Sequence, residues 1–518
     1  MNDKAKNSIG KVCLVGAGPG DPGLITVTGL NRLRGCDVVV FDALANPALL
    51  AEAPDNAQRI DVGKRAKNHK LTQDQTNQLL VDLAREGKDV VRLKGGDPYL
   101  FGRGAEECAF LTKHGVYCEV VPGVTSGIAA PATAGIPVTH RKVASTITIV
   151  TGHEDPTKGE TSVDYDGLAK LIDRGGTACF YMGVGRLQQI ADSLAACGLG
   201  LSTPAAVVQW GTLPRQRTAK GTLDTIKAEV DRLGVSSPAI IVVGEVAAID
   251  EPGLDYFTDR PLFGQRILVT RTRQQASDLR RELAELGAEV IEAPTIELVA
   301  PSADDEARLN DAIDRIDEND WVLLTSANAA NVLAQRLEAA GRDVRQLGRV
   351  QIAAVGDATT AALWDRLRLR SDFVPDSFSG EAMAKQFIEE QAVEGRRCLL
   401  LRADIARPAL PKLLVEAGAI VNEVVAYQTR VPESLPEGVL DALREGVDWA
   451  TFTSSSTVRN LLELLGEERA LLHGVKTASI GPITTQTMRE LGLEVTVESE
   501  TASVASLVEA VASAESVS

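Results

Sequence analysis

The sequence has little cysteine and no long apolar run. Its 518 residues include seven cysteines, which are odd in number, lie far apart and never form a C-x-x-C pair. This pattern argues against a disulfide framework and a zinc site, and it predicts a reducing compartment. No apolar run approaches the roughly 20 residues of a membrane helix, and no signal peptide precedes the first strand-like segment. We therefore expect a cytoplasmic protein that does not bind membranes.

Positive charge and aromatic side chains are also scarce. Lys and Arg number 54 against 71 Asp and Glu, a formal net charge of −17, and no basic face or tail is visible. We therefore expect no nucleic acid partner. Aromatic residues make up only 4%, but 44% of the chain is hydrophobic and the 45 glycines are scattered. Collagen-like, low-complexity and disordered chains are therefore excluded, and the length predicts several domains.

Short Val- and Ile-rich runs alternate with amphipathic stretches along the whole chain. Examples of such runs are residues 12–15, 38–41, 90–93, 147–150, 179–182 and 240–243. This alternation predicts an α/β architecture with largely parallel sheets. Residues 251–264 are rich in Pro, Asp and Gly and have no clear period, so we expect a linker there between domains 1–250 and 265–518.

The second domain contains an internal repeat. Three blocks recur in the same order, at Gly264 and Gly395, at Trp321 and Trp449, and around Gly356 and Gly481. Their offsets are 131, 128 and 125 residues, so the spacing is nearly kept. Two similar α/β lobes are the simplest physical consequence.

Hydroxyl-bearing turns stand where strands give way to helices in both lobes. The candidate ligand contacts in these turns are Thr325, Ser326, Gly356 and Thr359 in one lobe, and Ser454 and Thr484 in the other. Free N–H groups at helix starts bind anions. Four such turns favour a shared cleft for a polyanionic ligand, although simple helix capping is the alternative for each one. No Ser-His-Asp set, metal cluster or catalytic carboxylate pair stands out in this half.

A glycine-rich loop, residues 16–23, follows the first predicted strand. It contains G-x-G-x-x-G, and Asp42 ends the next strand, so spacing alone indicates a Rossmann dinucleotide site. However, Pro19 and Pro22 lack the backbone N–H that would hold a pyrophosphate, and Asp21 adds negative charge there. The loop therefore suits a ligand without phosphates, and an NAD-dependent oxidoreductase is the less favoured alternative.

Two more glycine-rich turns, at 93–104 and 121–127, also follow predicted strands. Small residues at strand ends let the backbone approach a ligand, so the three turns together outline a pocket, although tight packing explains each one alone. Basic residues gather at 59–70 and 139–142, and Arg103 is isolated from other cations in a glycine-rich loop. These islands are either solvated surface or a docking surface for carboxylates.

The motifs of residues 8–250 resemble those of uroporphyrinogen-III C-methyltransferases, members of the tetrapyrrole methylase family. In order, the matching motifs are VGAGPGDPGLIT, VVVFDAL, VGKRAKNH, VVRLKGGDPYLFGRGAEE, VVPGVTSGIAAPATAGIPVTHR, FYMG, TPAAVVQWGT and SPAIIVVGEV. The resemblance implies two α/β subdomains with a cleft between them, usually in a homodimer. It also implies S-adenosylmethionine as the methyl donor and two successive methylations of uroporphyrinogen III to give precorrin-2.

The same resemblance implies site residues. The methyl donor would lie against Pro19, Gly95, Gly96, Asp97, Leu100, Thr125, Ser126, Met182 and Gly211. Asp42 would accept a proton and Lys64 would donate one. The substrate carboxylates would face Arg65, Arg103, His140 and Arg141.

Residues 265–518 are similar to uroporphyrinogen-III synthases. The similarity rests on the repeated lobes and on TSANAANVL, AVGDATTAAL, VVAYQTR, FTSSSTVRNLL and IGPITTQTMRELG. It implies cyclisation of hydroxymethylbilane with inversion of the last ring and loss of water, without cofactor or metal. Residues 265–300 and 430–518 would form lobe one and 301–429 lobe two, and Tyr427 would assist departure of the hydroxyl group.

We therefore predict a two-subdomain methylase fold followed by a bilobal synthase fold in one bifunctional chain of the sirohaem or cobalamin branch. The alternative for the second half is a module that binds a tetrapyrrole without catalysis.

Overall fold

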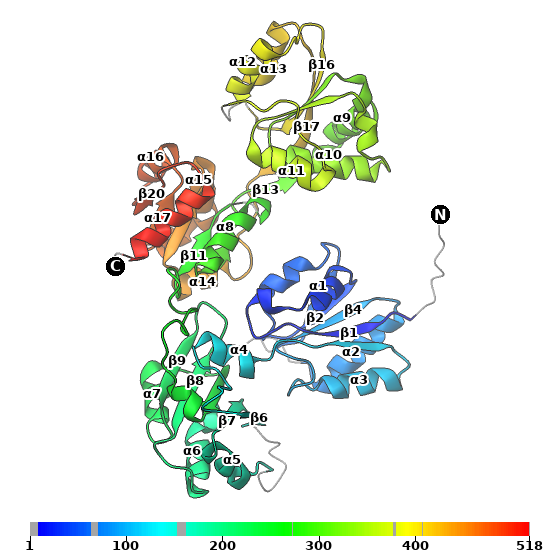
Figure 1. The fold of residues 1–518 in the computed structure, drawn as a ribbon. Coiled ribbons are helices and arrows are strands. Elements are labelled where there is room, and N and C mark those ends of the chain that lie inside the picture. Colours follow the sequence, from blue (N-terminus) through cyan, green and yellow to red (C-terminus); the bar gives the residue numbers. More distant parts are fainter. Residues whose placement is uncertain are drawn as a thin grey trace. The chain divides into compact units, whose positions relative to one another are not determined.

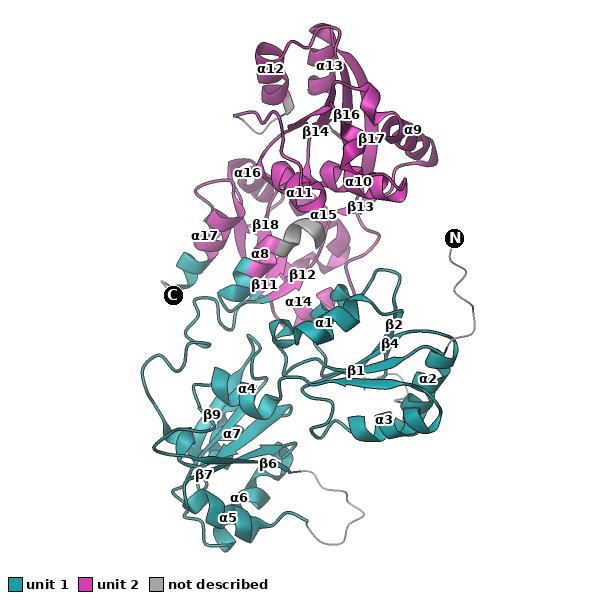
Figure 2. Cartoon of the chain, turned by 45° about the vertical axis from the view of Figure 1, so that its right-hand side comes forward, with its two compact units in different colours: residues 1–266, 282–289, 512–518 teal, residues 267–281, 290–511 magenta. Residues whose placement is uncertain are grey.

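The computed structural model describes residues 9–63, 71–152, 162–271, 273–376, 380–406 and 408–516. The chain forms two compact units, one of residues 1–266, 282–289 and 512–518 and one of residues 267–281 and 290–511 (Figure 2). Within these described residues, four five-stranded sheets with flanking helices confirm the predicted α/β class (Figure 1). Among the described helices, none combines the length and apolar character needed to cross a membrane.

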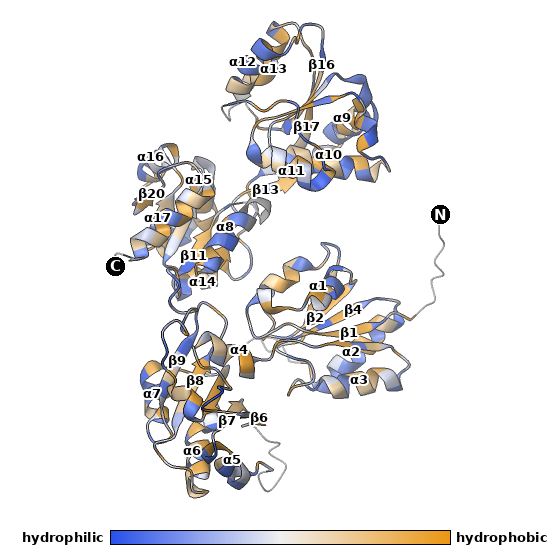
Figure 3. Cartoon of the chain, viewed as in Figure 1, coloured by the Kyte–Doolittle hydropathy of each residue, from blue (hydrophilic) through white to orange (hydrophobic). Residues whose placement is uncertain are grey.

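The first sheet is parallel throughout, with strand order β3-β2-β4-β1-β5. Its elements are β1 (Val12–Gly16), α1 (Val27–Arg34), β2 (Val38–Phe41), β3 (Gln58–Asp61), α2 (Gln73–Arg85), β4 (Val90–Lys94), α3 (Gly104–Lys113) and β5 (Cys118–Val121). Figure 3 shows β1 and β2 as largely apolar, as expected of parallel strands covered on both faces. The carboxyl ends of these strands share one edge of the sheet, and the glycine-rich turns lie there.

The second sheet, with order β6-β7-β10-β8-β9, is mixed and not largely parallel as predicted. Its elements are α4 (Ser126–Thr133), β6 (Thr146–Thr151), α5 (Tyr165–Asp173), β7 (Gly176–Tyr181), α6 (Leu187–Ala196), β8 (Pro204–Gln209), β9 (Arg217–Thr222), α7 (Ile226–Leu233) and β10 (Ala239–Val243). Strand β10 pairs antiparallel with both β7 and β8, and β8 with β9. Because β8 and β9 are joined by a short loop without a helix, they run in opposite directions.

The expected linker, residues 251–264, contains no helix or strand but is packed. The side chains of Phe257 and Leu262 are buried, and the Leu262 N–H donates to the Leu286 carbonyl at 2.9 Å. This segment is therefore held against the end of the first helix of the following domain.

The third and fourth sheets hold the repeated blocks. The third, β12-β11-β18-β19-β20, comprises β11 (Arg266–Val269), α8 (Arg273–Glu285), β12 (Glu289–Glu292), α14 (Val439–Glu445), β18 (Trp449–Phe452), α15 (Ser455–Leu465), β19 (Lys476–Ser479), α16 (Pro482–Glu490), β20 (Val497–Glu498) and α17 (Val504–Ser516). The fourth, β13-β17-β16-β14-β15, comprises β13 (Glu297–Val299), α9 (Ala303–Asp314), β14 (Trp321–Leu324), α10 (Ala327–Ala339), β15 (Gln351–Ala354), α11 (Asp357–Leu367), α12 (Gly380–Glu390), β16 (Arg397–Ala403), α13 (Ala409–Glu416) and β17 (Ile420–Arg430).

The repeated blocks occupy equivalent places in these two sheets. Strands β12, β11, β18 and β19 follow one another in the third sheet as β17, β16, β14 and β15 do in the fourth. The sequence repeat is therefore a repeat of strand order. Strand β13 pairs antiparallel with β17, so residues 297–299 belong to the fourth sheet although we placed them in lobe one.

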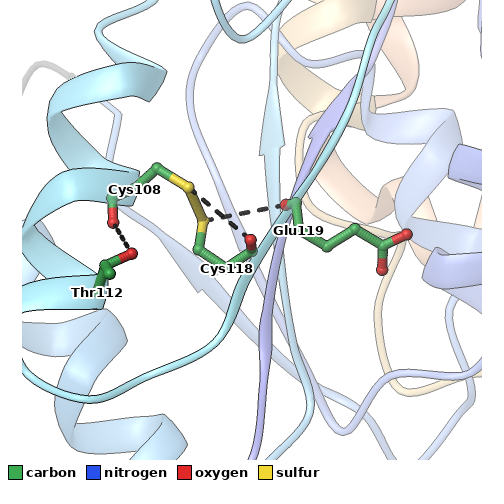
Figure 4. Close-up of a disulfide and its surroundings, with 4 residues drawn as sticks. All are labelled: Cys108, Thr112, Cys118 and Glu119. Carbon is green, nitrogen blue, oxygen red and sulfur yellow. Dashed lines mark hydrogen bonds between the residues drawn. A yellow bond between two sulfur atoms is a disulfide. The ribbon is translucent and has the colours of Figure 1, made fainter.

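A disulfide joins Cys108 on α3 to Cys118 at the start of β5, with their Cα atoms 5.7 Å apart (Figure 4). The cysteine pattern argues against a disulfide framework, and this single disulfide is one that the pattern did not indicate. A tight turn after α3, with Gly115 at φ 76°, reverses the chain and brings the two residues together. The other five cysteines are free, and burial raises the pKa of the Cys179 thiol to about 12, which makes it unreactive.

Candidate functional site

The three glycine-rich turns of the first subdomain meet in backbone contact. Gly18 and Gly96 form an antiparallel bridge with N···O distances of 3.3 and 2.7 Å. A Cβ added to Gly123 would lie 2.2 Å from the Gly96 carbonyl oxygen and 2.7 Å from the Cα of Gly16. Only glycines allow this approach, so the turns predicted to outline a pocket do lie together.

Asp97 connects two of these turns. Its Oδ2 accepts the Gly123 N–H at 3.0 Å and its Oδ1 accepts the Tyr99 N–H at 2.8 Å. Its carboxylate therefore fixes the loops and places negative charge beside the glycines. Gly95 is also confined, because an added Cβ would lie 2.7 Å from the Cβ of Leu44.

The second subdomain contributes the remaining predicted donor contacts. The Thr125 hydroxyl lies 2.5 Å from the Tyr181 hydroxyl, and the ring of Tyr181 packs against Phe101 with centroids 5.3 Å apart. The Asp21 N–H donates to Thr212 Oγ1 at 3.0 Å. The turns after β1 and β4 thus touch the loop that follows β8 and the last residue of β7.

The other predicted donor contacts lie on the same loops. Met182, directly after β7, is 52% exposed, and Gly211 lies so close to α4 that an added Cβ would be 2.2 Å from that of Ala130. Ser126 starts α4, while Pro19 and Leu100 are partly buried. Five of the six non-glycine residues with positive φ in the described chain occur in these loops, namely Phe101, Arg103, Met182, Trp210 and Thr212. Such strain is typical of ligand sites.

The loop after β1 does not provide a phosphate cradle. The Asp21 side chain already accepts the Gly23 N–H at 2.8 Å, and α1 begins only at Val27, capped by Thr26. A dinucleotide site instead needs free N–H groups at a helix that starts in the glycine turn. The geometry therefore fits a ligand without phosphates, such as a sulfonium-bearing methyl donor, and disfavours the NAD alternative.

Asp42 follows β2 at the same edge of the sheet. Its Oδ1 accepts the Leu44 N–H at 3.2 Å, its Oδ2 lies 3.4 Å from Nη2 of Arg92, and its side chain is 29% exposed. It is thus held at both oxygens and still open to solvent. Lys64 and Arg65, the predicted proton donor and a predicted substrate contact, lie outside the described residues.

A buried ionic group behind Asp42 was not predicted. Arg92 and Lys94 on β4 are buried, and Glu107 on α3 is fully buried between them. Oε1 of Glu107 lies 3.0 Å from Nζ of Lys94 and 3.6 Å from Nε of Arg92. Burial, followed by the charge of Arg92, lowers the pKa of Lys94, while Glu107 opposes this shift.

The predicted substrate cations differ in their surroundings. Arg103 is exposed and pairs with Glu106 on its own helix at 2.6 Å, so a substrate carboxylate would compete with Glu106. His140 closes a turn by exchanging backbone hydrogen bonds with Ala144 at 2.9 and 2.8 Å, and its Nδ1 is buried with no partner in the described part of the chain. Arg141 is exposed in that turn.

In the second unit, Tyr427 near the end of β17 is largely buried. Its hydroxyl lies 3.0 Å from Oγ of Ser326, which caps α10 by accepting the Ala329 N–H at 3.1 Å. Thr325 and Gly356 are partly buried at the carboxyl ends of the neighbouring strands β14 and β15. These residues of the fourth sheet therefore lie at one edge.

The predicted hydroxyl turns are only partly available to a ligand. Ser454 caps α15 as Ser326 caps α10, with the Thr457 N–H at 3.3 Å. Thr359 and Thr484 are each 4% exposed and face the core, so their hydroxyls do not line an open surface. The candidate contacts for a ligand that remain are the backbone at the starts of these helices and the capping residues Ser326 and Ser454.

Comparison with known proteins assigns both halves. Residues 11–227 match the family of tetrapyrrole (corrin/porphyrin) methylases, and residues 277–509 match the family of uroporphyrinogen-III synthase HemD.

Three curated relatives illustrate the match. The porphyrin biosynthesis protein HemD of Ruminiclostridium josui is 39% identical over 88% of this chain and 88% of its own length. A uroporphyrinogen-III C-methyltransferase of Bacillus subtilis (strain 168) is 40% identical over 72% of this chain and 74% of its own. An S-adenosyl-L-methionine-dependent uroporphyrinogen III methyltransferase of Methanosarcina barkeri is 48% identical over 47% of this chain and 94% of its own. The chain thus belongs to the tetrapyrrole methylases in its first half and to the uroporphyrinogen-III synthases in its second.

Proposed function

We propose that this chain is a bifunctional enzyme of tetrapyrrole biosynthesis. Its second half, residues 265–518, closes hydroxymethylbilane to uroporphyrinogen III without a cofactor. Its first half, residues 1–250, then transfers two methyl groups from S-adenosylmethionine to that product and gives precorrin-2. The observation that carries the proposal is the set of glycine turns that meet without a phosphate cradle, in a chain that joins both families.

The methyl-transfer site works mainly by positioning. S-adenosylmethionine, when bound, supplies an electrophilic methyl group on a cationic sulfur. The turns at Gly96 and Gly123 and the carboxylate of Asp97 would hold this donor, together with Met182 and Gly211. The pyrrole carbon that gains the methyl group becomes part of a cationic ring, which must lose a proton. Asp42 is the proposed acceptor of that proton, with Lys64 as a proton donor.

The synthase half provides hydroxyl groups and backbone contacts. Tyr427, with its hydroxyl 3.0 Å from Ser326, is the proposed group that assists the departing hydroxyl of hydroxymethylbilane. Water leaves from the terminal carbon of the first ring, and the substituted α-carbon of the last ring bonds to the carbon left behind. The old bond between the last ring and the preceding bridge carbon then breaks. The other α-carbon of the last ring bonds to that bridge carbon and loses its proton, so the macrocycle closes with the last ring inverted. The helix starts of both lobes, including Gly356 and Ser454, are proposed to bind the substrate carboxylates.

The full-length protein tests both activities in one reaction. With hydroxymethylbilane and labelled S-adenosylmethionine, we expect uroporphyrinogen III followed by a product with two labelled methyl groups. If only the symmetric isomer of spontaneous closure appears, the second half is a binding module and not a synthase. If supplied uroporphyrinogen III takes up no label, the methyltransferase assignment is wrong.

Replacement of Tyr427 by phenylalanine tests the synthase chemistry. Because the ring still fills its buried position and only the hydroxyl is lost, we expect the fold to persist and cyclisation to slow by roughly 100-fold, the lower end of the range for one positioned proton donor. Initial rates of uroporphyrinogen III formation measure this effect. Ser326→Ala is the matched variant, since it removes the partner hydroxyl, and a smaller loss is expected. A Tyr427→Phe enzyme with the wild-type rate would contradict the role of the hydroxyl.

We also propose that the methyltransferase half forms a homodimer and that the protein works in the cytoplasm, as its family resemblance implies. Sedimentation at micromolar concentration tests the dimer, and a monomeric species would contradict it. Fractionation of the cells that make the protein tests the compartment.

A further inference from the structure

Two cations and an anion lie in an apolar layer of the first subdomain. Arg92 and Lys94 are two residues apart on β4, so their side chains leave the same face of the sheet. That face also carries Val12, Leu14, Val38, Val40 and Val90, and Leu111 of α3 belongs to the same buried cluster. Charged side chains in such a layer cost free energy unless they are paired, and a hydrophobic replacement would pack at least as well. The group therefore needs an explanation other than stability.

The charges alternate in sign from the interior to the surface. Glu107 Oε1 is 3.0 Å from Lys94 Nζ and 3.6 Å from Arg92 Nε, and it also accepts a hydrogen bond from the side-chain amide N–H of Gln73 at 3.0 Å. Arg92 Nη2 is in turn 3.4 Å from Asp42 Oδ2. This row of contacts, from Lys94 through Glu107 and Arg92 to Asp42, contains two positive and two negative charges. It ends at the Asp42 side chain, which is 29% exposed.

Arg92 itself has a fixed orientation. Its Nη1 donates to the Leu93 carbonyl at 3.2 Å, while Glu107 faces its Nε and Asp42 its Nη2. The opposite oxygen of Asp42 accepts the Leu44 N–H at 3.2 Å. The carboxylate of Asp42 is therefore held from both sides. Among the described residues, Asp61 at the end of β3 is also charged and lies in register with Phe41 on β2.

We propose that Arg92 is a positioning residue for methyl transfer, which holds the Asp42 carboxylate oriented toward the substrate. The inference rests on the proposed function and on Asp42 as the proton acceptor. Glu107 and Lys94 hold Arg92 in turn, so that the guanidinium cannot swing away. A carboxylate held in this way accepts a proton without first rotating or exchanging partners.

A double-mutant cycle in the full-length protein tests this inference. The variants are Asp42→Asn, Arg92→Gln and their combination, and the measurements are kcat and KM for labelled methyl transfer to uroporphyrinogen III. We expect Asp42→Asn to lower kcat on the order of 100-fold, as for loss of a general base. Arg92→Gln should lower it about tenfold, and the double variant should be no slower than Asp42→Asn. The KM for S-adenosylmethionine should be unchanged in all three.

Two further variants separate positioning from folding. Arg92→Lys keeps the charge but not the two-pronged geometry, and we expect it to recover part of the rate; if Arg92→Gln does not fold, this variant takes its place in the cycle. Arg32→Gln is the matched control, because Arg32 contacts both oxygens of Glu119 at 2.9 Å near the amino ends of β1 and β5. It should keep the wild-type kcat.

Losses that multiply in the double variant would overturn the inference, because Arg92 would then act independently of Asp42. A wild-type kcat for Asp42→Asn would overturn it as well, while methyl transfer by the chain would stand. Absence of methyl transfer in the wild-type protein would instead remove the proposed function.

Discussion

Replacing Gly123 by alanine is expected to weaken S-adenosylmethionine binding by roughly 10- to 100-fold. The new Cβ would lie 2.2 Å from the Gly96 carbonyl oxygen and 2.7 Å from the Cα of Gly16. Both are backbone atoms that cannot rotate away, so the turns that follow β1, β4 and β5 must separate. Overpacking of this kind costs about 1–3 kcal/mol, and 1.4 kcal/mol is tenfold in affinity. Calorimetric titration with S-adenosylmethionine measures the effect.

Two controls accompany this variant. Gly200→Ala adds the same methyl group in the second subdomain, where the nearest atoms are Ser202 Oγ at 3.8 Å and Thr203 Oγ1 at 3.9 Å, and it should bind the donor normally. The Gly123→Ala protein should also still form uroporphyrinogen III, since that activity belongs to the other compact unit. Wild-type affinity in Gly123→Ala would show that the donor is held elsewhere.

The parallel first sheet and the glycine turns at its edge were predictable from the sequence, because both depend on local patterns. Strands such as Val38–Phe41 are uninterrupted apolar runs, and each glycine turn follows such a run. The direction of β8, β9 and β10 was not predictable in this way. Whether two neighbouring strands run parallel depends on which strand each one pairs with in the sheet. The apolar runs VVQ in β8 and AIIVV in β10 do not indicate these partners.

The ionic group behind Asp42 did leave a signal that the sequence analysis missed. In VVRLK, Arg92 and Lys94 alternate with apolar residues, so a strand buried on both faces must bury both cations. Their anion could not be identified, because Glu106 and Glu107 are adjacent and only the phase of α3 decides which one faces the sheet.

The burial of Thr359 and Thr484 was also predictable. Leu363 and Met488 each follow one of these threonines by four residues, and residues four apart share one face of a helix. Both are fully buried. The threonines therefore had to face the core, and the repeated Gly-x-x-Thr-Thr pattern is in part a packing signature and not only a ligand signature.

Replacing Glu107 by glutamine is expected to lower the free energy of unfolding of the first subdomain by about 3–5 kcal/mol, the range for breaking a buried ion pair. The neutral amide would leave Lys94 and Arg92 buried with Asp42 as their remaining counter-charge. Hydrogen exchange of β4 and α3 along a urea series reports this subdomain separately from the rest of the chain. Glu106→Gln is the matched control on the adjacent residue. Its ion pair with Arg103 is exposed, so the loss should stay below about 1 kcal/mol.

Alkaline pH should relieve part of the loss in Glu107→Gln. Burial lowers the pKa of Lys94 in the folded protein, whereas the unfolded chain keeps the ordinary value of 10.5. Between these two pKa values the unfolded state binds more protons, so stability rises with pH there. Because Glu107 raises the pKa of Lys94, its removal widens this window toward lower pH. The difference between variant and wild type should therefore shrink as the pH approaches 10.5, and a constant difference would contradict the role of Lys94.

Replacing Arg92, Lys94 and Glu107 together by apolar residues separates their contribution to folding stability from their contribution to methyl transfer. In Arg92→Leu, Lys94→Met, Glu107→Leu no buried charge is left unpaired, and such replacements are neutral or stabilising by about 1–4 kcal/mol in other proteins. We therefore expect the triple variant to recover the hydrogen-exchange protection that Glu107→Gln loses. Methyl transfer should still fall, because Asp42 no longer has Arg92 beside it. If the triple variant were both stable and fully active, the buried charges would serve neither purpose; if it were unstable, their role would be structural.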